Sequence, residues 1–112
     1  MRIWGLKNCD TCRKAIKALG AAGADVRFVD IRSEADLPDL VPQWLDTVGA
    51  KALLNSRSTT WRGLDEDTRA AASDTPDTVL IAHPALIKRP VIMSEHATTV
   101  GWTADTATAH GV

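Results

Sequence analysis

The pattern of apolar and polar positions at the start of the chain predicts a strand, a helix and a second strand. The run RIWGL, at residues 2–6, is short, apolar and typical of a strand. After Asp10 the apolar residues recur at helical spacing, and Gly23 stands where a glycine commonly ends a helix. The segment DVRFVDI then returns to alternation. Because a strand, a helix and a strand follow one another within about thirty residues, we expect a βαβ unit with parallel strands.

The middle of the chain follows the helical period. An apolar stripe is opened by Asp36 and Pro38 and closed by Gly49. The passage KALLNSRSTTWRGL is predicted to be mostly loop, with a short apolar core at Leu53-Leu54. Two further short helices are predicted within DEDTRAAASDTPDTVLIAHPALI, separated near Thr75-Pro76.

Two short strands are predicted near the C-terminus, PVIMS (Pro90–Ser94) and TTVGW (Thr98–Trp102), joined as a hairpin and followed by a last helical turn. The order β-α-β, helical block, β-β-α is that of the thioredoxin plan with an insertion. We therefore predict an α/β, thioredoxin-like fold with a four-stranded mixed sheet and an inserted helical subdomain. One domain is expected over residues 1–112, with the helical insertion at roughly 36–87.

Composition and charge narrow the functional classes. Apolar residues make up 45% of the chain and charged residues 24%, which is ordinary for a soluble globular protein. The net charge is −1 with both signs mixed along the chain, which argues against a nucleic-acid binder and a polybasic membrane patch. No apolar run approaches the ~18–20 residues of a membrane span, and the start MRIWGLKNCD lacks the features of a secretory signal. We expect a cytoplasmic protein.

The two cysteines, Cys9 and Cys12, allow three interpretations: a metal clip, a structural staple or a redox pair. A staple is disfavoured because reducing compartments keep structural disulfides rare and the closed loop is very small. A zinc site normally needs four ligands, and the three histidines are not spaced as a pair, so no metal is expected.

A redox role suits Cys9 best, because it lies at the predicted strand-to-helix junction. Free N–H groups and the positive end of the helix dipole stabilise a thiolate there, and Lys7 and Arg13 flank the pair with positive charge. Cys12 is one turn further on, where it is placed to attack a disulfide or adduct on Cys9. It also belongs to the apolar helix stripe, so a plain buried cysteine is the alternative for Cys12.

Three segments, LKNCDTCRKA, LLNSRSTTWRGL and LIKRPVI, resemble in order and spacing the ArsC/Spx family of thioredoxin-fold proteins, and especially its YffB-like branch. The likeness runs from about Ile3 to Trp102. It implies that Cys9 is the nucleophile and that Arg57 and Arg89 hold an anionic group. Two guanidinium groups and a helix N-terminus around a thiolate make a sensible anion pocket.

The resemblance also bears on the residues beside the nucleophile and on the backbone facing it. Asn8 and Thr11 are placed to donate hydrogen bonds to a thiolate or a bound oxyanion. In thioredoxin-like folds a cis proline opens the strand facing the active-site cysteine, so we predict a cis Arg89–Pro90 bond.

The sequence departs from the arsenate reductases of this family at three points. They carry a third arginine after the hairpin, where this chain reads VGWTAD, and a histidine four residues before the cysteine, where this chain has Gly5. Their C-x-x-S is C-x-x-C here.

The leading prediction is a glutathione-dependent thiol–disulfide oxidoreductase or arsenate reductase-like enzyme. No bound cofactor is expected; glutathione would be a co-substrate, a glutaredoxin-type protein a possible reductant, and the substrate a small anion or thiol compound. We expect a monomer. The alternative is an Spx-like redox-sensing transcription regulator that binds RNA polymerase.

Overall fold

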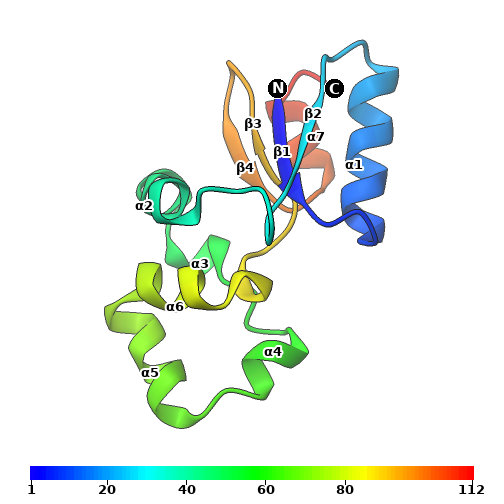
Figure 1. Ribbon diagram of the computed structural model, residues 1–112. Helices are drawn as coiled ribbons and strands as arrows, with labels where there is room; N and C mark the ends of the chain where they lie inside the picture. The colour runs from blue at the N-terminus through cyan, green and yellow to red at the C-terminus, as the bar shows by residue number, and fades with distance from the viewer. The chain divides into compact units, whose positions relative to one another are not determined.

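The computed structural model describes residues 1–112 and confirms the predicted α/β class with a mixed four-stranded sheet (Figure 1). The strands run in the order β2-β1-β3-β4 across the sheet. The central strand β1 pairs in parallel with β2 and antiparallel with β3, and β3 pairs antiparallel with β4. The predicted βαβ unit and C-terminal hairpin are both present. The strands are β1 (Arg2–Gly5), β2 (Arg27–Asp30), β3 (Val91–Met93) and β4 (Thr98–Val100).

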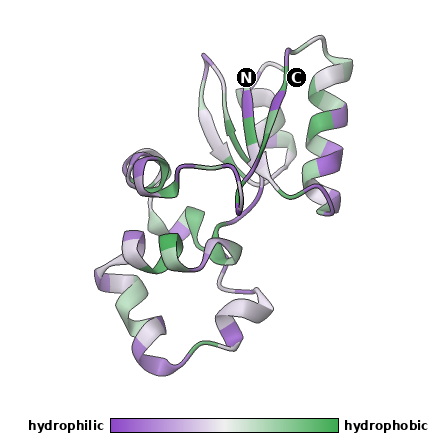
Figure 2. Ribbon diagram, viewed as in Figure 1, coloured by the Kyte–Doolittle hydropathy of each residue, from purple (hydrophilic) through white to green (hydrophobic).

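Residues 1–35 and 89–112 form one compact unit, the sheet unit. It contains the four strands and the helices α1 (Asp10–Ala21) and α7 (Ala104–Ala109). Ile3 of β1 lies opposite both Phe28 and Ile92, so these three side chains share one face of the sheet. Helix α1 packs Ala15 and Leu19 on that face, and its apolar and hydrophilic stretches alternate in Figure 2 as one-sided burial requires.

The C-terminal hairpin is shorter than predicted on both strands. Its second strand ends at Val100, because Gly101 takes a positive φ of 81° that breaks the extended backbone. The Gly101 N–H donates to the carbonyl of Pro90 at 2.8 Å, which fixes the turn out of the sheet. Trp102 then packs against the core under α1 instead of extending the strand.

His110, which the sequence analysis did not single out, ties α7 to this hairpin. Its ring is buried, with Nδ1 at 2.6 Å from Ser94 Oγ and Nε2 at 2.7 Å from Thr99 Oγ1. Ser94 Oγ already accepts the N–H groups of His96 and Ala97. Its own hydrogen is therefore assigned to Nδ1, which leaves the Nε2–H to donate to Thr99.

Residues 36–88 form a second compact unit, the helical unit. The predicted first helix is present, with its stripe buried at Leu37, Val41 and Trp44, and Gly49 at a φ of 84° follows its last residue. The helices are α2 (Leu37–Val48), α3 (Ala50–Leu53), α4 (Thr59–Arg62), α5 (Glu66–Asp74), α6 (Pro76–Ala82) and the 3₁₀ turn η1 (Pro84–Leu86). The residue after α3, Leu54, and the residue after η1, Ile87, form an isolated antiparallel bridge.

The passage predicted to be mostly loop, KALLNSRSTTWRGL, contains most of α3 and the whole of α4. Each of these helices has four residues, too few to show a helical period in the sequence. Helix α4 is begun by Ser58, whose Oγ accepts the Trp61 N–H at 3.1 Å. No helix in the molecule has both the length and the apolar character that crossing a bilayer would require.

Candidate functional site

Cys9 is the residue that leads from the loop after β1 into α1. Its N–H donates to the Leu6 carbonyl at 3.1 Å, and its own carbonyl accepts the Arg13 N–H at 3.0 Å. Its backbone is extended, with φ −91° and ψ 119°, so it is the N-cap residue of the helix. The side chain is half-buried. The sequence prediction of a cysteine at a strand-to-helix junction is confirmed.

The surroundings of Cys9 favour its thiolate. Partial burial raises the pKa of the thiol, but hydrogen bonds from the Cys12 N–H, the Cys12 thiol and Arg89 outweigh it, and the positive charge of Arg89 adds to them. The net effect is a pKa below the ordinary value of 9.0. These interactions act on the negative charge, so they favour the ionised form of Cys9.

The pKa of Cys12 is shifted in the opposite direction to that of Cys9. Its side chain is fully buried, and burial raises its pKa to about 11. A hydrogen bond from the Leu6 N–H acts against this rise, whereas the hydrogen bond with Cys9 and the charge of that neighbour add to it. At neutral pH the Cys12 thiol is therefore protonated. Cys12 therefore holds its proton and donates it toward Cys9.

Arg89 belongs to the sheet unit, two residues before β3 begins, and is half-buried. The Arg89–Pro90 bond is cis, as predicted. The sequence analysis also assigned positive charge near Cys9 to Lys7 and Arg13. In the structure Arg13 forms an ion pair with Asp10, the first residue of α1. The guanidinium that interacts with Cys9 is that of Arg89.

The remaining predicted site residues fall in two places. Asn8 directly precedes Cys9, Thr11 is the second residue of α1, and both side chains are exposed. Arg57 lies in the helical unit and is also exposed; its backbone N–H donates to Asn55 Oδ1 at 3.2 Å. The structure thus brings Cys9, Cys12 and Arg89 into contact and places Arg57 in the other unit.

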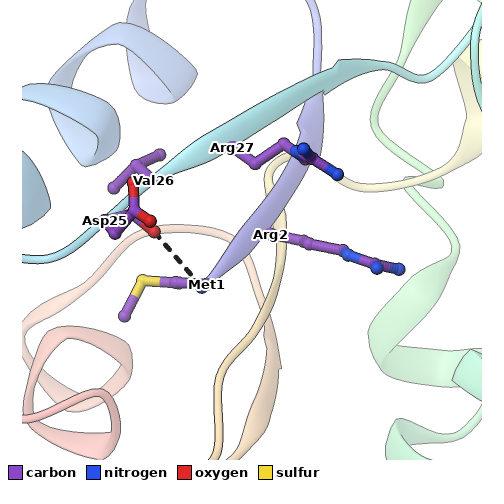
Figure 3. Close-up of a pocket in the computed structure, with 5 residues that line it drawn as sticks. All are labelled: Met1, Arg2, Asp25, Val26 and Arg27. Carbon is purple, nitrogen blue, oxygen red and sulfur yellow. Dashed lines mark hydrogen bonds between the residues drawn. The ribbon is translucent and has the colours of Figure 1, made fainter.

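Two hollows open at the other end of β1, away from Cys9. The larger, of about 420 Å³, is lined by Met1, Arg2, Asp25, Val26 and Arg27 (Figure 3). Arg2 and Arg27 are register partners on neighbouring strands, and their side chains extend to the same side. The other hollow, of about 340 Å³, is lined in part by His110 and His96. Neither hollow is lined by Cys9 or Cys12.

No three His, Cys, Asp or Glu side chains gather into a group that could hold a metal ion. Both cysteines are free thiols. The arrangement can form a covalent bond at Cys9, offer a guanidinium to an anionic group bound there, and supply a second sulfur from Cys12.

Known proteins resemble this chain over nearly its whole length. An uncharacterised protein of Haemophilus influenzae is 36% identical over 101 residues, which cover 89% of each chain. The solved structure of the YffB (PA3664) protein is 31% identical, with a TM-score of 0.87 over 97% of this chain and 96% of that one. An arsenate reductase (ArsC) related protein from Brucella melitensis is 33% identical, with a TM-score of 0.74 over 97% and 92% of the two chains.

The likeness in fold confirms the predicted arsenate reductase-related architecture, including the YffB-like resemblance. The profile of the ArsC family matches residues 4–109, which include the cysteine pair, Arg57 and Arg89. The chain therefore belongs to the ArsC family.

Proposed function

We propose that this protein is a thiol-dependent reductase in which Cys9 is the nucleophile. The observation that carries the proposal is the environment of Cys9: a helix N-terminus, a thiol donor and a guanidinium all favour its ionised form. A thiolate, not a thiol, attacks a disulfide or an oxyanion centre. Membership of the ArsC family supports the same reaction class.

The first step has two versions that share one chemistry. With a glutathione mixed disulfide, the Cys9 thiolate attacks one sulfur, a new S–S bond forms, the old one breaks and the other sulfur leaves as a thiolate. With arsenate, the thiolate forms an S–As bond and one arsenic oxygen leaves as water after protonation. Glutathione then attacks the Cys9 sulfur, arsenic leaves with the bonding electron pair as arsenite, and Cys9 is left as a mixed disulfide.

Cys12 or a further glutathione then resolves the mixed disulfide. While Cys9 is a free thiolate, its charge and its hydrogen bond help to keep the Cys12 pKa high. Once Cys9 is part of a mixed disulfide, that charge is gone, so Cys12 ionises more readily at the moment when its attack is useful. Attack by Cys12 on Cys9 Sγ releases glutathione and leaves a Cys9–Cys12 disulfide, which an external thiol of the glutathione or glutaredoxin type reduces.

The anionic part of the substrate is assigned to Arg89 and Arg57, with Asn8 and Thr11 as hydrogen-bond donors beside the nucleophile. Arg89 already interacts with Cys9. The roles of Arg57, Asn8 and Thr11 rest on the family resemblance. Glutathione is the proposed co-substrate, with no bound cofactor and a monomer as the working unit. The regulator alternative gains no support from the two solved structures named above, which are described as a YffB protein and an arsenate reductase (ArsC) related protein.

The test is the pH dependence of Cys9 alkylation by iodoacetamide, followed by mass spectrometry. We expect an inflection below the ordinary thiol pKa of 9.0, and protection by glutathione disulfide, by arsenate or by both. Protection by arsenate identifies the oxyanion version, and protection by glutathione disulfide alone identifies the disulfide version. An inflection at or above the value of a free cysteine contradicts the proposal.

Turnover is measured with glutathione as reductant and hydroxyethyl disulfide or arsenate as substrate. Cys9→Ser should reduce turnover of both to the uncatalysed rate, because the step that forms the covalent bond is lost. Cys12→Ser is the matched control, since it changes the same atom one turn away and retains the first attack. Equal loss in both variants would assign the chemistry to the pair as a unit; retention of turnover in Cys9→Ser would overturn the role of Cys9.

A further inference from the structure

Gly5 is the last residue of β1 and lies against the thiol pair. A Cβ atom placed on Gly5 would be 2.5 Å from Cys12 Sγ, a separation that real Cβ atoms do not show. The next contacts, Cys12 Cβ at 3.4 Å and a ring carbon of Phe28 at 3.6 Å, would be ordinary ones. The φ angle of Gly5 is not positive, so its backbone conformation is open to other residues. The obstacle to a side chain at position 5 is therefore the sulfur of Cys12.

We infer that Gly5 is a positioning residue for the thiol pair: the absence of its Cβ seats the Cys12 sulfur against β1, where it faces Cys9. In this seat the sulfur has the Leu6 N–H and the Cys9 sulfur as its hydrogen-bond partners. Because the nucleophilic role of Cys9 belongs to the proposed function, the catalytic meaning of this inference rests on that function. The packing itself does not.

The sulfur cannot make room for a Cβ by a small shift. The sulfur is bonded to the Cβ that the helix backbone carries, and α1 is held in place by the fully buried residues Ala15 and Leu19. Only rotation about χ1 would move it, and in a helix the rotamers available to such a side chain are few. A side chain at position 5 would thus either strain the core or turn the sulfur away from Cys9.

The consequence for the reaction is specific. With glutathione disulfide as oxidant, the Cys9 thiolate forms Cys9–S–S–glutathione and releases one glutathione thiolate. Cys12 then gives its proton to solvent and attacks Cys9 Sγ, so that the S–S bond to glutathione breaks and a second glutathione leaves. If the Cys12 sulfur is turned away, Cys9 loses one hydrogen bond to its thiolate, so the first step slows but continues, and the second stops.

The geometry is tested by a double-mutant cycle in reducing buffer, which needs no activity. Gly5→Ala should lower the melting temperature in the wild-type background and leave it unchanged or raise it in Cys12→Ala, whose side chain ends at Cβ. Gly20→Ala on α1, where a Cβ would meet nothing within 4 Å, is the control and should raise the melting temperature. If Gly5→Ala does not fold, folding of the double variant gives the coupling directly.

The chemical consequence is tested by mass spectrometry after incubation with glutathione disulfide. Wild type should proceed to the Cys9–Cys12 disulfide, whereas folded Gly5→Ala should accumulate the Cys9–glutathione mixed disulfide. A Gly5→Ala penalty that is equal in both backgrounds, or internal disulfide formation as fast as in wild type, overturns the inference. An unreactive Cys9 in wild type with an intact stability cycle would instead overturn the proposed function alone.

Discussion

In the sheet unit one titratable side chain lies at the N-terminus of a helix and another at the C-terminus of a different helix, and the two differ in charge. Cys9 begins α1 and His110 follows the last residue of α7, and the pKa of each is lowered. For Cys9 the lower pKa favours the charged form, but for His110 it favours the neutral form. A helix C-terminus by itself favours a protonated histidine, but burial, together with the charge of His96, lowers the pKa of His110. Local partners and burial, more than the helix end, set the charge.

The largest effect is expected from replacing His110, the side chain held in its neutral form. His110→Ala leaves the hydroxyls of Ser94 and Thr99 without the ring nitrogens they now contact, and should cost about 2 kcal/mol of unfolding free energy. Urea denaturation measures this loss. His96→Ala, at an exposed position of the hairpin turn, is the control and should change stability by less than about 0.5 kcal/mol. Equal losses in the two variants would contradict the role of His110.

The next largest effect is expected at Cys9, the side chain held in its charged form, when Arg89 is replaced by Gln (Arg89→Gln). Loss of the guanidinium removes both a hydrogen bond and a positive charge from the Cys9 thiolate, so its pKa should rise. We expect alkylation of Cys9 at pH 6 to slow severalfold, because a higher pKa leaves a smaller fraction of Cys9 as thiolate. Arg89→Lys, which keeps the charge, should retain part of the rate.

Arg13→Gln is the matched control for Arg89, because Arg13 is close to Cys9 in sequence but forms an ion pair with Asp10. It should leave the alkylation rate nearly unchanged, and circular dichroism would confirm that each variant is folded. A larger effect of Arg13→Gln than of Arg89→Gln would return the role to the charges next to Cys9 in the sequence.

The smallest expected effect is the contribution of His110 to the pH dependence of folding stability. Above the ordinary histidine pKa of 6.5, His110 is neutral in both the folded and the unfolded chain and contributes no pH dependence. As the pH falls below 6.5, the unfolded chain takes up a proton that the folded chain disfavours, so stability should decrease. His110→Gln, which retains an acceptor and a donor, should flatten the stability profile between about pH 7 and pH 5. An unchanged slope would show that other groups cause it.

Local patterns in the sequence were sufficient for much of the fold. The period of the apolar residues placed α1 and α2, alternation placed β2, and a short apolar run placed β1, because these patterns depend on neighbours a few positions apart. The helices α3 and α4 escaped prediction because four residues show no period. The second hairpin strand was predicted to end at Trp102, two residues too late, since the sequence does not show the positive φ of Gly101.

The site was predictable only in part, for a similar reason. Cys9 was found from its place before a helix, and Arg89 from the family resemblance. The charges assigned to Lys7 and Arg13 were those nearest in sequence, whereas Arg89, far along the chain, is the one that interacts with Cys9. The bonds of His110 to Ser94 and Thr99 span 16 and 11 residues and likewise leave no local signal.

The close approach of Gly5 and Cys12 also constrains the order in which this site can change during evolution. A chain that gained the second cysteine while position 5 still carried a side chain would meet the 2.5 Å clash, whereas one that first acquired glycine would not. The reverse holds for loss: the cysteine must go before the glycine is free to vary. Designers who wish to install a second thiol in a relative should therefore make two substitutions, seven positions apart, with the glycine first.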